Sequence, residues 1–75
     1  MKIKDFAVGS NLKVTGYDKS QKAYRQKLLS MGLVKGTDFK IVRVAPMGDP
    51  VELKIKSFNL SLRKDEANAL EVEEV

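Results

Sequence analysis

The residues that could do chemistry in this chain are carboxylates, lysines and hydroxyls, because it contains neither histidine nor cysteine. Histidine is the commonest general base and metal ligand, and cysteine supplies thiolates and disulfides. The acids that could share a cation are Asp49 with Glu52, and Glu71 with Glu73 and Glu74. Transition-metal sites usually include imidazole or thiolate, so we interpret these acids as solvated surface groups. The sequence therefore predicts no catalytic residue, no metal site and no cofactor.

The glycines and lysines raise two further possibilities, phosphate binding by a glycine loop and nucleic-acid binding by a basic surface. Gly32 and Gly36 flank Lys35, but the glycines of a phosphate-binding loop lead into a helix, whereas these end a helical pattern. The 14 Lys and Arg residues could contact nucleic acid. Such surfaces interleave exposed aromatic side chains, and most of the three Phe and two Tyr are needed for a core. We expect neither nucleotide nor nucleic-acid binding.

Length and composition limit the chain to a single domain, residues 1–75. A chain of this size buries only about 60–65% of its unfolded surface, which is too little for two cores. No apolar run approaches the roughly 20 residues of a membrane span, and no apolar segment of signal-peptide length opens the chain. We therefore expect a cytoplasmic protein.

Charge is distributed unevenly. All 14 basic residues lie within positions 1–64, and positions 65–75 hold five of the ten acids. This distribution fits a cationic face for an anionic partner, or a small soluble domain whose acidic last strand lies beside basic neighbours.

The elements that position these residues are mostly short strands. Alternation of apolar and polar residues predicts strands at 12–17, 51–56, 58–63 and 70–75, and a β-branched run predicts one at 38–45. A helix is expected at about residues 20–31, capped by Asp18 (with Gln21 completing a capping box) or by Ser20, with a short helical turn near 64–68. Five short strands favour a mainly β fold, a small five-stranded SH3-like barrel with one inserted helix. The residues expected in its core are Leu12, Val14, Leu28, Ile41, Val51, Leu53, Ile55, Leu60, Leu62 and Val72.

Turns are marked by glycine and proline. Gly32 is expected to end the helix in a left-handed conformation, with Leu33 folding back onto Leu28. A bend or bulge is expected near Val42, where the alternation of apolar residues changes phase. The structural turn residues are predicted to be Gly32, Gly36, Gly48 and Pro50.

Apolar residues gather at the end of the predicted helix. Ala23, Tyr24, Leu28 and Met31 share one helical face, which leaves Leu29 near solvent. These residues could pack around the mouth of the barrel, or form an exposed patch for a protein partner. On the second interpretation the partner-binding residues are Arg25, Leu29, Met31, Leu33, Val34 and Lys35. The lysine-rich strands around Lys54 and Lys56 are a second candidate surface.

Three stretches taken together resemble the bacterial ferrous iron transport protein A (FeoA) family: AYRQKLLSMGLVKG at 23–36, VRVAPMGDPV at 42–51 and LSLRKDEA at 60–67. The resemblance implies an SH3-like barrel and a small non-enzymatic adaptor that supports ferrous iron uptake. Its partner would be the cytoplasmic GTP-binding domain or core of a ferrous iron permease, so membrane contact would be indirect. Ser57 departs from the family, which usually has glycine between the third and fourth strands. The alternatives are a small barrel that binds peptide or nucleic acid, and a modulator of the permease's GTP turnover.

Overall fold

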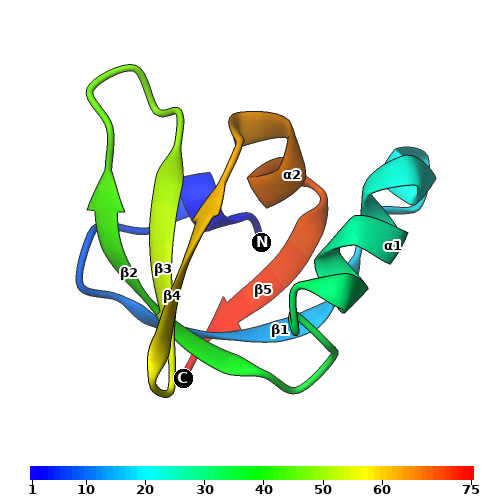
Figure 1. Cartoon of the computed structure of the whole chain (residues 1–75), viewed down its shortest axis with the longest axis horizontal. Coiled ribbons are helices and arrows are strands. Elements are labelled where there is room, and N and C mark those ends of the chain that lie inside the picture. Colours follow the sequence, from blue (N-terminus) through cyan, green and yellow to red (C-terminus); the bar gives the residue numbers. More distant parts are fainter.

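The computed structural model describes all 75 residues, Met1–Val75. Five antiparallel strands form one curled sheet in the order β4-β3-β2-β1-β5, in which β1 and β5 cross β2–β4 at a steep angle (Figure 1). The strands are β1 (Asn11–Tyr17), β2 (Asp38–Val44), β3 (Val51–Ile55), β4 (Phe58–Leu62) and β5 (Leu70–Glu74). The predicted mainly β, five-stranded fold is confirmed.

Helices occupy the two longer connections and the N-terminal segment. The inserted helix α1 (Lys22–Ser30) follows a 3₁₀ turn, η2 (Lys19–Gln21), and the short helix α2 (Lys64–Asn68) bridges the two edge strands β4 and β5. Another 3₁₀ turn, η1 (Ile3–Asp5), precedes β1. The longest of these helices has nine residues, and none has the length and apolar character that crossing a bilayer requires.

Two irregularities curl the sheet. The β2–β3 ladder shifts register between Ile41 and Arg43, so the irregularity expected near Val42 is present. Beyond this shift Val42 and Val44 are both exposed. The β1–β5 ladder shifts between Val14 and Gly16, which the sequence did not predict. A bulge bends its strand and increases the local twist, which lets short strands wrap around one core.

The core fills the inside of this curl. All the predicted core residues are buried except Leu60, which is half-buried because β4 is an edge strand with no neighbour on its outer side. Ile3 is also buried, although its 3₁₀ turn is too short to show a period in the sequence. The other buried residues outside the predicted set are Leu33, Phe39, Ala67, Ala69, Leu70 and Glu66.

The helix α1 begins later than the sequence predicts. The Asp18 carboxylate accepts hydrogen bonds from the backbone N–H (2.9 Å) and hydroxyl (2.7 Å) of Ser20, and so caps η2. Gln21 precedes α1 and makes no side-chain capping bond, so the expected capping box is not formed. Ala23 is exposed, and the prediction that it faces the core is wrong. The later start leaves the first turn of α1 away from the sheet, and only Leu28 of this helix is fully buried.

An ion pair joins α1 to α2. Glu66 is the buried charged residue of the protein, and its carboxylate pairs with the Lys27 ammonium of α1. It also accepts a hydrogen bond from the Arg63 backbone N–H at 2.9 Å, at the start of α2. The hydrogen bond from Lys27, helped by that from Arg63, holds the pKa of Glu66 below its ordinary value despite burial. The buried carboxylate is therefore ionised, and the Lys27 ammonium and the Arg63 N–H compensate for its burial.

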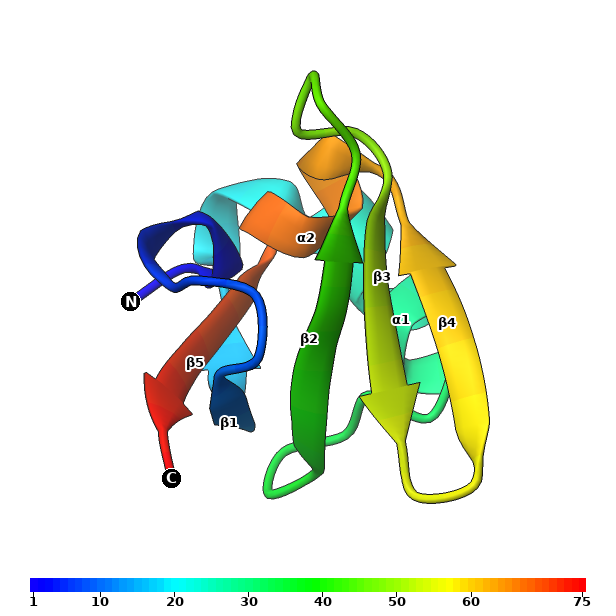
Figure 2. The same ribbon diagram turned by 90° about the vertical axis from the view of Figure 1, so that its left-hand side faces the viewer.

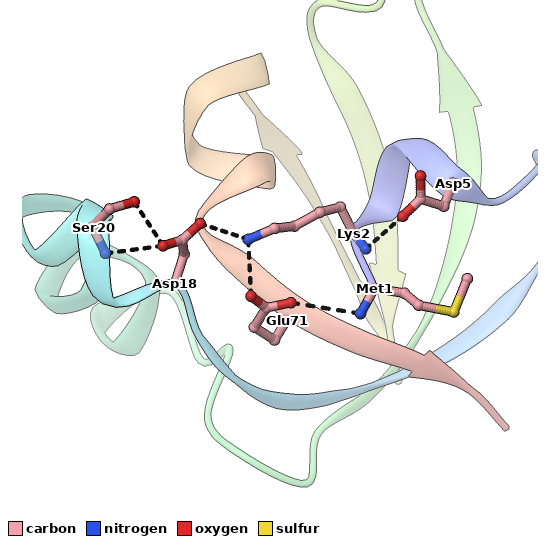
Figure 3. A network of polar contacts seen from close by, with 6 residues as sticks. All are labelled: Met1, Lys2, Asp5, Asp18, Ser20 and Glu71. Atoms are coloured by element: carbon pink, nitrogen blue, oxygen red, sulfur yellow. Dashed lines mark hydrogen bonds and ion pairs between the residues drawn. The ribbon is translucent and has the colours of Figure 1, made fainter.

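A second polar network holds the N-terminal segment (Figure 3). The Lys2 ammonium lies 2.8 Å from a carboxylate oxygen of Asp18 and 3.0 Å from one of Glu71. It thus ties the first residues to the end of β1 and to β5, and Ile3 beside it enters the core. The hydrogen bonds from Lys2 and Ser20 hold the pKa of Asp18 far below its ordinary range.

Replacing Asp18 by Asn tests this network through pH. Because the pKa of Asp18 is lower in the folded state, its carboxylate stabilises the fold above the unfolded pKa of about 4. That stabilisation is lost as the pH falls from about 4 toward the lowered folded value. Asp18→Asn should therefore unfold at lower urea concentration than the parent protein near pH 7, and the difference should shrink near pH 3. Asp65→Asn, at an exposed position, is the control, and a pH-independent difference for Asp18→Asn would contradict the account.

Candidate functional site

The C-terminal end of α1 forms one wall of the candidate site. The Leu33 backbone N–H donates to the Leu28 carbonyl (3.0 Å), and that of Gly32 donates to the Leu29 carbonyl (3.1 Å). Gly32 has a φ of 90°, a conformation that glycine reaches without steric cost. These features make a Schellman ending, in which the chain reverses and returns an apolar side chain to the helix. Leu33 and Leu28 are accordingly both fully buried in the same core.

The loop that follows is fixed to β1. The Tyr17 hydroxyl donates a hydrogen bond to the Leu33 carbonyl at 2.5 Å. Further along, the Gly36 N–H donates to the Val14 carbonyl (2.8 Å), and the Val14 N–H donates to the Thr37 carbonyl (2.9 Å). Burial raises the pKa of Tyr17, so at neutral pH its hydroxyl keeps the proton that it donates. Residues 33–37 therefore form a fixed wall.

The β3–β4 hairpin forms the opposite wall. Its two-residue turn consists of Lys56, which has a φ of 51°, and Ser57. The left-handed residue of this turn is thus Lys56, one position before the glycine that the family resemblance leads one to expect. The Phe58 side chain is 45% exposed, and a Cβ added to Gly32 would lie 3.8 Å from its Cζ atom. The hairpin and the α1 loop therefore meet at Gly32 and Phe58.

An open groove of about 950 Å³ lies between the two walls. Its lining combines the exposed apolar residues Val34, Phe58 and Val75 with four lysines. These four residues, which we call the groove lysines, are Lys35, Lys40, Lys54 and Lys56. The ion pairs of the protein include none of them. Asp38 is the one acidic side chain in the lining, so the groove is strongly positive.

A smaller cavity of about 270 Å³ lies at the other end of the molecule. It is lined by Phe6 and by Val44 and Met47 of the β2–β3 hairpin, which rises above α2 (Figure 2). Gly48, with a φ of 78°, lies in that hairpin, and Pro50 follows a cis peptide bond at its end. Both positions expected to form turns thus lie far from the groove.

The predicted partner-binding residues separate in the structure. Val34 and Lys35 line the groove, as does the expected turn glycine Gly36, which has a φ of 93°. Leu33 has no exposed surface, so the prediction that it contacts a partner is wrong. Helical periodicity does not continue past Gly32, where the chain reverses and carries this side chain inward.

The other three predicted residues lie on α1 or at its end, outside the groove lining. Met31 is half-buried and packs against the core. Leu29 is half-buried rather than largely exposed. Arg25 is exposed, and its guanidinium lies 5.6 Å from the centre of the Tyr17 ring, an arrangement that supports the tyrosine holding the loop.

Two kinds of groove residue were not recognised as site residues from the sequence. Phe58 continues the alternation of Leu60 and Leu62, and this pattern indicated an inward-facing side chain. It is exposed instead, because it begins an edge strand at the rim of the sheet. Lys40 joins Lys54 through the pairing of β2 with β3, which the sequence alone does not show.

Two of the acids considered as cation ligands, Glu71 and Asp49, make contacts within the protein. The Glu71 carboxylate lies 3.0 Å from the Lys2 ammonium, and that of Asp49 accepts a hydrogen bond from the Lys64 N–H at 3.1 Å. No three Asp or Glu side chains are grouped as a metal site would require.

These observations define a class of protein, a small curled β-sheet domain with a positive groove at one end. The chain belongs to the FeoA family, since the family model for the FeoA domain matches residues 1–74. This family takes part in ferrous iron transport. A solved FeoA-like protein from Clostridium acetobutylicum is 39% identical, with a TM-score of 0.88 over 100% of this chain and 86% of that chain.

Two further relatives bear on fold and context. FeoA from Stenotrophomonas maltophilia, described as a prokaryotic SH3 domain protein, has a TM-score of 0.79 at 22% identity over 97% of this chain and 89% of that chain. The predicted SH3-like fold is therefore confirmed. A fusion of Fe(2+) transport protein A with the Fe(2+) transporter FeoB in Porphyromonas gingivalis is 42% identical over 50 residues. The match covers 67% of this chain and 6% of the fusion protein.

Replacing Gly32 by Ala tests the helix ending that builds the groove. A side chain at a φ of 90° is strained whatever space surrounds it, so Gly32→Ala should lower the free energy of unfolding by about 1–2 kcal/mol. Gly16→Ala is the matched control, because Gly16 has an ordinary φ and an added Cβ would meet no atom within 4 Å. The control should change stability by no more than about 0.5 kcal/mol in urea denaturation. Equal losses of unfolding free energy in the two variants would show that the fold does not depend on the left-handed conformation of Gly32.

Proposed function

We propose that the protein is a non-enzymatic adaptor that supports ferrous iron uptake by binding the cytoplasmic portion of a ferrous iron permease. The observation that carries this proposal is the groove, in which exposed apolar side chains lie among unpaired lysines. The protein would then act in the cytoplasm, and would reach the membrane through the permease. Iron would be the cargo of the permease and would not be held by the adaptor.

The fusion protein of P. gingivalis supports the choice of partner. There a segment related to this chain and a transporter are parts of one polypeptide. Covalent linkage gives two modules a high effective concentration, so even a weak contact between them is maintained. In a separate adaptor the contact depends on the affinity of a surface, and the groove offers such a surface.

The chemistry of the groove suits a protein segment. Drug-sized ligands bind in sites that enclose most of their surface, whereas this groove is open along its length. Val34 and Phe58 are each nearly half exposed, so docking would remove apolar surface from water and supply affinity. The groove lysines would speed association with a partner of opposite charge and select against others.

Replacing Val34 by Ser tests the position of the docking surface. Val34 lines the groove with 46% of its side chain exposed, so Val34→Ser should weaken binding to the permease's cytoplasmic portion by about tenfold while changing thermal stability little. Val8→Ser is the matched control, since Val8 is 56% exposed and lies outside the groove. The measurement is calorimetric titration of each variant, with thermal unfolding in parallel.

Leu29→Asp separates the groove from the flank of α1. If the groove is the docking surface, this variant should bind like the parent protein, because Leu29 does not line it. Loss of binding in Leu29→Asp, with unchanged binding in Val34→Ser, would place the partner on the helix and would contradict the groove assignment.

A further inference from the structure

The groove lysines come from separate parts of the chain and meet without neutralising partners. Lys35 lies in the loop after α1, Lys40 on β2, Lys54 on β3 and Lys56 in the β3–β4 turn. Of the basic side chains, Lys2, Lys27 and Arg63 lie within 4 Å of a carboxylate, and the groove lysines differ from the other unpaired ones in lining a single groove.

Two features of this cluster disfavour the isolated fold. Lys40 and Lys54 are directly opposite each other in the β2–β3 ladder, and like charges at such positions repel. Lys56 has a φ of 51°, a conformation that costs a side chain free energy and that glycine would adopt without strain. A bound polyanion would neutralise the repulsion, and would use the ammonium group that the strained turn presents.

We propose that the groove binds an extended acidic segment of the partner protein, with one apolar side chain seated between Val34 and Phe58. Lys54 lies on β3 and Lys56 in the turn that follows it, and both line the groove. An extended segment that crosses this part of the groove can bring carboxylates to both lysines. The inference rests on the proposed function for the identity of the partner, and on the groove itself for its chemistry.

The apolar part of the lining distinguishes this ligand from nucleic acid. Single-stranded nucleic acids stack successive bases on several exposed aromatic rings. Phe58 is the exposed aromatic ring of the groove, because Phe39, which also lines it, is buried. An acidic peptide with a single apolar side chain matches a groove that has four lysines and one exposed aromatic ring.

The test uses a fluorescent decapeptide of alternating Glu and Ser residues with one central Leu, followed by anisotropy at low salt. The parent protein should bind this peptide, and binding should weaken as salt is raised. The double variant Lys54→Ser/Lys56→Gly should bind about tenfold more weakly. The matched control Lys19→Ser/Lys22→Ser removes the same charge from exposed positions outside the groove and should change affinity less than about twofold.

Lys56→Gly alone separates binding from folding. It relieves the left-handed strain, so its thermal unfolding midpoint should equal or exceed that of the parent protein while peptide affinity falls. Replacing the central Leu of the peptide by Ser should weaken its binding to the parent protein, because the apolar side chain between Val34 and Phe58 is then lost. Failure of the peptide to bind, equal losses in the two double variants, or tighter binding of a single-stranded oligonucleotide would overturn the inference.

Titrating the same variants with the permease's cytoplasmic portion distinguishes the adaptor proposal from the acidic-segment proposal. If it binds the parent protein and the Lys54→Ser/Lys56→Gly variant equally, the adaptor role holds and the acidic-segment inference fails. If it does not bind while the peptide does, the chemistry of the groove holds and the permease assignment fails.

Discussion

The chain reversal at the end of α1 is the constraint on which the groove depends. Gly32 takes a φ of 90°, and Leu33 returns to the core beside Leu28. Because Leu33 is anchored, the residues after it must run along β1, where the Tyr17 hydroxyl and the Val14 backbone hold them. A different ending of the helix would leave Leu33 outside and the wall unformed.

The ion pairs of the protein and the groove involve different charged residues. The ion pairs of Lys2 join the N-terminal segment to the end of β1 and to β5, and the Lys27–Glu66 pair joins the last turn of α1 to α2. The loop after α1 and the β3–β4 turn lie together at the other end, away from α2 (Figures 1 and 2). There the lysines have no partners, and a like-charged pair lies across the β2–β3 ladder. Lys4 of η1 and Lys64 of α2 are unpaired as well, so the groove is distinguished by the gathering of four unpaired lysines around one hollow.

The sequence predicts features that depend on neighbouring residues. The strict alternation of β3 placed Val51, Leu53 and Ile55 in the core, and a glycine after an apolar helix end predicted the reversal at Gly32. Features that depend on how elements meet could not be predicted. The pairing of Lys27 with Glu66 requires the placement of α1 against α2, and the approach of Lys40 to Lys54 requires the shifted register of β2 and β3. Leu33 was expected both to fold back onto Leu28 and, as part of the apolar run at the helix end, to contact a partner, and its burial bears out the first expectation.

The central claim is that a partner docks in the groove between the α1 loop and the β3–β4 hairpin. Nuclear magnetic resonance of ¹⁵N-labelled protein, titrated with the cytoplasmic portion of the permease, tests it most directly. The account predicts that the largest amide shift changes fall on the groove-lining residues of the α1 loop, the start of β2 and the β3–β4 hairpin. Changes concentrated instead on the outer face of α1, or around α2 and the β2–β3 hairpin, would contradict it.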